Sequence, residues 1–252
     1  MIDVAPLARF GLLLVRPGML VVVAPPLGGS YAPPQVKVGL TVLIALALAP
    51  VVPVPPAGPA AALSGVVLRE AAIGLALSLA MRALVAAAEL AGQLAGFQMG
   101  LSYGATVDPQ SGVRNTLLAA LYSQLTVFAM LLTNAHHACF RAIAHSYAAL
   151  PIGAGAVGGT VPQIVIRLFA VVFTIGARLA APLVAVLLVA EVALGLVARS
   201  APSLNLMVAS PSVRVMVGLL ALAVLAPSVI GVMAGLADGV VRLGVDAMQA
   251  FR

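Results

Sequence analysis

Three histidines and the only cysteine of the chain stand close together: His136, His137, Cys139 and His145. Imidazole and thiolate groups are ligands that zinc prefers, so this group is the first place to consider a metal site. No carboxylate stands near it, however, and its spacing matches no known ligand signature. We therefore interpret the group as a cluster at a helix end or at a membrane interface, and we expect no metal.

Catalytic chemistry finds little support elsewhere in the chain. The sequence contains no HExxH zinc motif and no phosphate-binding loop. We expect no cofactor and no enzymatic activity.

Two acidic residues, Glu89 and Glu191, lie deep within long apolar blocks. An ionisable group in such a place either handles ions or protons, or forms a structural pair with an opposite charge. We favour a structural pair with an arginine, such as Arg82 or Arg199, over a role in proton transfer.

The composition indicates the surroundings of the chain. Apolar residues make up 63% of the 252 residues and charged residues only 8%. A soluble domain is about half apolar and about a quarter charged, so a soluble enzyme, a disordered protein and a coiled coil are excluded. The net charge of +6 comes from basic residues that are spread singly, which argues against nucleic acid as a partner. We predict a polytopic membrane protein in contact with membrane lipid.

Six apolar blocks, separated by proline and glycine, must position these residues. They run from about 7–23, 36–49, 64–101, 115–143, 161–198 and 213–236. The third and fifth blocks are about twice as long as a helix that crosses the hydrocarbon core. Either each of them bends back as a hairpin, or the protein extends beyond the bilayer plane. We expect one all-α membrane domain, residues 1–252, built from about six long apolar segments that form bent helical hairpins.

The third block carries a polar face followed by a row of glycines. Its polar side chains fall within about 60° of one another on an ideal helix: Ser78, Arg82, Glu89 and Gln93. The glycines that follow stand at every fourth position: Gly92, Gly96, Gly100 and Gly104. Glycines at this spacing let another backbone approach closely. A similar row stands near the C-terminus: Gly231, Gly235 and Gly239. The neighbouring backbone belongs either to the same chain or to another subunit. Our candidates for subunit packing are Arg82, Glu89, Gly92, Gly96 and Gly100.

Residues 103–112 are the least membrane-like part of the middle of the chain. Asp108-Pro109 and Ser111-Gly112 are typical of turns, so the chain leaves the helix here. The segment is either a plain connection or a functional loop such as a gate.

This loop ends the run from Glu89 to Gly112, ELAGQLAGFQMGLSYGATVDPQSG, which resembles the FliR/SctT family of type III export-gate proteins. Three further segments resemble the same family: Asn134–His137 (NAHH), Leu150–Gly153 (LPIG) and Glu191–Asn205. The NAHH and LPIG segments are more similar to the flagellar branch than to the virulence branch. The sequence departs from the family pattern at Ala135, where glycine is usual.

The resemblance implies a non-enzymatic channel subunit of the flagellar type III protein export gate, required for flagellum assembly. It implies a multi-pass protein of the bacterial inner membrane, in a helical assembly of bent hairpins with FliP and FliQ homologues that sits largely above the membrane plane, within the flagellar basal body. FlhB and FlhA are implied as further partners, and unfolded flagellar subunits as the exported cargo. The corresponding family loop looks like a plug that narrows the closed pore. Its residues here are Tyr103, Gly104, Ala105, Thr106, Val107, Asp108, Pro109, Gln110, Ser111, Gly112, Val113, Arg114 and Asn115.

Two other functions stay open. The first is a subunit of a virulence-type (SctT) secretion gate. The second is a proton-coupled secondary transporter in which Glu89 and Glu191 carry protons, with residues 34–50 and 211–227 as traces of an internal repeat.

Overall fold

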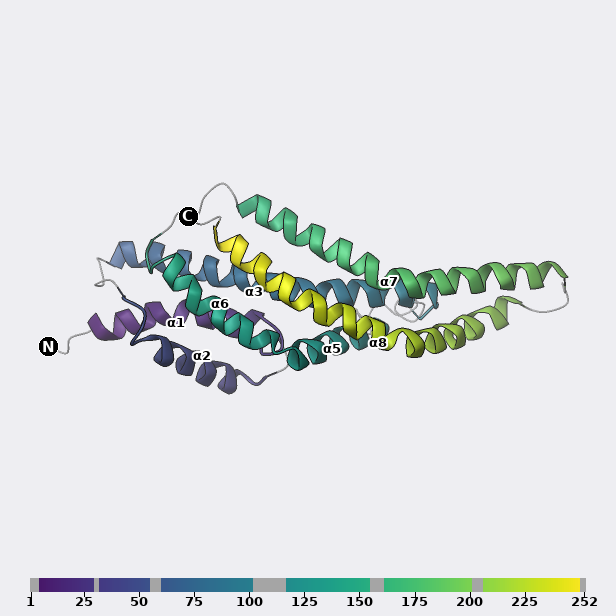
Figure 1. Cartoon of the computed structure of the whole chain (residues 1–252), viewed down its shortest axis with the longest axis horizontal. Helices are drawn as coiled ribbons and strands as arrows, with labels where there is room; N and C mark the ends of the chain where they lie inside the picture. The colour runs from purple at the N-terminus through teal and green to yellow at the C-terminus, as the bar shows by residue number, and fades with distance from the viewer. Residues whose placement is uncertain are drawn as a thin grey trace. The chain divides into compact units, whose positions relative to one another are not determined.

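The computed structural model describes residues 5–29, 32–54, 60–101, 117–154, 161–200 and 206–249. Within these ranges the chain forms seven helices and no strand (Figure 1). The helices are α1 (Ala5–Val23), α2 (Pro34–Leu48), α3 (Ala60–Gln98), α5 (Leu117–Leu132), α6 (Ala135–Ala149), α7 (Val161–Ser200) and α8 (Leu206–Gln249). The predicted all-α class is confirmed.

The long apolar blocks are unbroken helices. α3 has 39 residues and α7 has 40, while α8 extends the last predicted block to 44 residues. Pro182 lies inside α7, and Pro211 and Pro227 lie inside α8, without ending either helix. Of the two alternatives for the third and fifth blocks, the structure therefore selects helices longer than the roughly 30 Å hydrocarbon core rather than hairpins within a block.

The fourth apolar block, 115–143, was predicted as one segment and contains two helices. α5 ends at Leu132 and α6 begins at Ala135, and the two helices are bent by 68° relative to each other. Asn134 between them has a φ of 56°, in the left-handed region that asparagine tolerates better than most residues. The fourth apolar block is therefore divided between two helices, and the described residues form seven helices from about six predicted apolar segments.

The membrane class is confirmed by the lengths and compositions of the helices. Four helices are long and apolar enough to cross a membrane, and the bent pair α5 and α6 makes a fifth if it forms one span. The apolar window of α3 is 67% buried inside the chain, whereas those of α7 and α8 are only 17% and 11% buried. α3 is thus a core helix, while α7 and α8 present most of their apolar surface outward.

The chain divides into two compact units. The first contains residues 1–83, 130–169 and 236–252, and the second contains residues 84–129 and 170–235. Four helices, α3, α5, α7 and α8, contribute residues to both units. The assignment of the whole chain to a single membrane domain stays a prediction.

In the first unit, α1 packs against both α2 and α3. α1 and α2 lie side by side (Figure 1). On α3, Gly74 has no side chain where α1 passes, and a Cβ atom there would lie 2.9 Å from the carbonyl oxygen of Arg16. Because real Cβ atoms do not approach backbone that closely, glycine at this position sets how near α1 comes to α3.

Candidate functional site

The predicted plug loop, Tyr103–Asn115, lies outside the described residues. The structure describes the helices that hold its two ends: α3, which ends at Gln98, and α5, which begins at Leu117. Both flanks belong to the second unit. The described part of the site is therefore the base of the loop.

The end of α3 is fixed by its backbone. Gly100 has a φ of 79°, the left-handed conformation that glycine adopts at little cost. The Leu101 N–H donates to the carbonyl of Gly96 at 3.0 Å, and the Gly100 N–H donates to the carbonyl of Phe97 at 3.1 Å. These two bonds form a Schellman motif, which satisfies the last carbonyls of a helix and turns the chain away from its axis. Gly100 therefore starts the loop.

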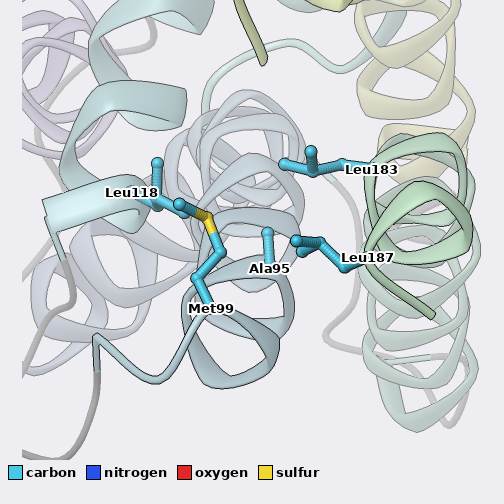
Figure 2. Close-up of a cluster of buried hydrophobic side chains, with 5 residues drawn as sticks. All are labelled: Ala95, Met99, Leu118, Leu183 and Leu187. Atoms are coloured by element: carbon cyan, nitrogen blue, oxygen red, sulfur yellow. The ribbon is translucent and has the colours of Figure 1, made fainter. Parts of the chain in front are cut away.

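A buried cluster joins the two flanks of the loop. Met99 precedes the loop and Leu118 follows it, and both are fully buried. The cluster also contains Ala95, Leu183 and Leu187, and Figure 2 shows the side chains of Met99 and Leu118 pointing toward each other. The chain therefore leaves and re-enters the helical core at one place.

Glycines let the helices of the second unit approach one another closely. A Cβ atom on Gly92 would lie 2.5 Å from the carbonyl oxygen of Leu118 and 2.5 Å from the Cα of Ala119, so α3 and α5 touch through their backbones. A Cβ atom on Gly176 of α7 would lie 3.0 Å from the carbonyl oxygen of Ala87. On α8, a Cβ atom on Gly218 would lie 2.6 Å from the sulfur of Met99.

The predicted subunit-packing residues lie in different surroundings. The space beside Gly92 is occupied by the backbone of α5 of the same chain. Gly96 is buried, and Gly100 ends α3. Arg82 and Glu89 are half-buried, and neither is without an interaction partner. Their role in subunit packing stays a prediction. The C-terminal row is different, because a Cβ atom on any of its glycines would meet nothing within 4 Å: Gly231, Gly235 and Gly239.

Glu191 has the arginine partner that its apolar setting predicts, but the arginine comes from another helix. The Arg214 guanidinium on α8 lies 2.7 Å from the Glu191 carboxylate on α7. The candidate partners named from the sequence, Arg82 and Arg199, do not include this arginine. Both side chains remain partly exposed, next to outward-facing apolar residues such as Val192 and Met216.

The histidine group packs as part of α6. The rings of His136 and His137 lie edge to face, with centroids 4.3 Å apart, and Cys139 is buried. Within the described ranges, no three His, Cys, Asp or Glu side chains are placed to share a metal ion.

Residues 100–104 (GLSYG) match the G-x-S-x-G spacing of a hydrolase nucleophile elbow. That motif works on a strand-to-helix turn, which exposes the serine above a sheet. Here the residues before it form the helix α3, and the described part of the chain contains no strand. Ser102, Tyr103 and Gly104 lie outside the described residues, and the helix before them is not the strand that the motif requires.

Sequence reasoning missed one polar pair, Arg16 of α1 with Glu70 of α3. Both side chains are fully buried, with an ion pair between Arg16 Nε and Glu70 Oε2. A second bond joins Arg16 Nη2 to Glu70 Oε1 at 3.1 Å. The signal was present, since each charge interrupts an apolar run. Arg16 interrupts the apolar block 7–23, and Glu70 stands near the start of the third block beside Arg69.

Most of the chain is similar to known proteins. Residues 7–240 match the family described as bacterial export proteins, family 1. The flagellar biosynthetic protein FliR of Escherichia coli K12 is 32% identical over 218 residues, which cover 85% of this chain and 82% of the relative. FliR of Caulobacter vibrioides is 28% identical over 217 residues, covering 84% and 86%. FliR of Bacillus subtilis is 28% identical over 159 residues, covering 62% and 61%.

Proposed function

The chain belongs to the bacterial export proteins, family 1, and from this we propose that it is a non-enzymatic channel subunit of the flagellar type III protein export gate. The observation that carries the proposal is the family match over residues 7–240, together with relatives that are named flagellar biosynthetic proteins. The helices long and apolar enough to span a membrane support a membrane location for such a subunit.

We further propose that the chain assembles with FliP and FliQ homologues, and with FlhB and FlhA, at the flagellar basal body in the inner membrane. The outward apolar surfaces of α7 and α8 support an assembly of this kind. Only 17% and 11% of their apolar windows are buried within the chain, so lipid or other proteins must cover the rest.

Residues 103–115 are proposed to close the pore at rest and to move aside for an extended substrate. Two features of the loop base support this proposal. The Schellman motif at Gly100 ends α3 sharply, and the cluster around Met99 and Leu118 holds both flanks at one place. A loop with fixed ends can move without unpacking the helices that carry it.

Deletion of Gly104–Gly112 tests the plug. In the assembled gate, the deletion is expected to raise ion leakage across the membrane, measured as conductance or as collapse of an imposed ion gradient. The matched control replaces the same residues with an equal number of glycines and serines, which separates the length of the loop from its sequence. An unchanged leak in the deletion variant rules out the plug.

Removal of the whole chain tests the function. Cells without it are expected to lose flagellar filaments and export of flagellar subunits, and the tagged chain is expected to co-purify with FliP and FliQ homologues. Intact motility with lost secretion of virulence proteins would instead indicate the virulence-type gate. A chain that purifies alone and moves a small solute would indicate the transporter.

A further inference from the structure

Three charged side chains of the first unit converge on the turn that follows α6, Leu150–Gly153. Arg16 comes from α1, and Arg69 and Glu70 come from α3. We propose that these residues form a clamp, which we call the Arg16 clamp, and that it ties the docking of α1 to the position of this turn. The chain continues from the turn toward α7.

Arg16 binds the C-terminal end of α6. Its Nη2 donates to the carbonyl of Leu150 at 2.8 Å, and its Nη1 donates to the hydroxyl of Ser146 at 3.1 Å. The guanidinium carbon lies 4.4 Å from the centre of the Tyr147 ring. A positive charge suits this place, because the last carbonyls of a helix lack backbone partners and carry partial negative charge.

Glu70 and Arg69 hold the other end of the turn. Glu70 Oε1 accepts the Gly153 N–H at 3.2 Å, and Arg69 Nη1 donates to the Gly153 carbonyl at 3.3 Å. Gly153 has a φ of 80°, so the turn needs glycine here. The backbone of the turn is thus bound at Leu150 through α1 and at Gly153 through α3.

The two central charges depend on each other. Arg16 and Glu70 are fully buried, and a buried charge that loses its partner is strongly unfavourable. If α1 is not docked, Glu70 keeps an unpaired charge in an apolar core and the Leu150 carbonyl loses its donor. The Tyr147 hydroxyl adds a second link, since it donates to the carbonyl of Leu13 on α1 at 3.1 Å. Docking of α1 and placement of the turn therefore become one event.

The presence of a buried ion pair does not by itself imply that the pair holds the Leu150–Gly153 turn. Apolar residues of similar volume often replace such a pair without loss of stability. If the pair only held α1 against α3, two apolar side chains could therefore do the same. The clamp differs, because its charges bind backbone groups of the turn that an apolar side chain cannot bind. The double substitution Arg16→Met with Glu70→Met separates the two roles, since it leaves no unpaired central charge.

Accessibility of the turn to a thiol reagent provides the test. The full-length chain, with Cys139→Ala, carries a single new cysteine, Ile152→Cys, at a position that is only 4% exposed. Labelling by N-ethylmaleimide is followed in membranes from expressing cells. The double Met variant is expected to label at least about tenfold faster than the parent, because the turn opens locally. Arg9→Met, which removes an exposed arginine from the same helix, is the matched control and is expected to change nothing.

A second probe separates local from general opening. Leu183→Cys reports on the core of the second unit, and its labelling is expected to stay slow in the double Met variant. Unchanged labelling of Ile152→Cys would show that the charges do not hold the turn. Faster labelling of both probes would show that they hold the whole chain. Either result overturns the proposal, and neither depends on the function in export.

Discussion

At the scale of single residues, glycine decides how closely the helices of the second unit approach. Gly92 and Gly231 both stand inside long helices, but they face different surroundings. Gly92 touches the backbone of α5, whereas Gly231 faces open space. The two positions therefore give opposite expectations for the same substitution.

Gly92→Ala is expected to destabilise the chain by about 1–3 kcal/mol, because the new methyl group forces α3 and α5 apart. Gly231→Ala is the matched control, and it is expected to be neutral or stabilising by up to about 1 kcal/mol, since alanine favours helix. The midpoint of thermal unfolding in detergent measures both. An equal midpoint for the two variants would contradict the backbone contact at Gly92.

Gly218 and Met99 form a coupled pair at the base of the loop. Gly218→Ala pushes against the flexible end of Met99, so the expected cost is only about 1 kcal/mol. In the background Met99→Ala that clash is absent, and the same substitution is expected to cost nothing. A double-mutant cycle on unfolding midpoints measures the coupling, and strictly additive effects would show that the two residues do not meet.

At the scale of elements, the break between α5 and α6 rests on one backbone conformation. Asn134→Val is expected to cost about 1–2 kcal/mol, because a β-branched residue is strained at a φ of 56°. Asn134→Gly, which fits the same conformation, serves as the control and is expected to keep the stability of the parent. Circular dichroism during heating follows both variants. A valine variant as stable as the glycine variant would argue that the helix has straightened.

The helices could be predicted from the sequence more fully than the contacts between them. The first predicted block, 7–23, became Ala5–Val23, because apolar runs and proline punctuation mark where helices begin and end. The break at Asn134 escaped prediction, since neither proline nor glycine marks it. The Arg16–Glu70 pair escaped because its members are 54 residues apart and meet only after α1 docks on α3. The predicted loop sequence says nothing of the cluster that holds its base, which depends on residues of α7.

At the scale of the whole molecule, α7 and α8 face outward with apolar side chains, and the Glu191–Arg214 ion pair joins them. Breaking a pair in water costs about 0–1 kcal/mol, whereas breaking it in apolar surroundings costs several times more. The Glu191–Arg214 pair therefore reports on what covers these helices.

Arg214→Met is expected to reduce the yield of chain recovered in complex with FliP and FliQ homologues, because it leaves Glu191 without its partner on a covered surface. The double variant Arg214→Met with Glu191→Gln removes the charge as well and is expected to recover most of the yield. Quantitative co-purification measures both. Full yield from the single variant would place the pair in water.

The unequal burial of the long helices also sets how the protein can change over evolutionary time. The buried face of α3 consists largely of alanine: Ala76, Ala80, Ala83, Ala87, Ala88, Ala91 and Ala95. Such positions have no spare volume, so even one added methylene group is disfavoured. The outward faces of α7 and α8 need only to remain apolar, and Val, Leu and Phe can replace one another there. Neutral drift should therefore be slow along α3 and fast along the outer helices.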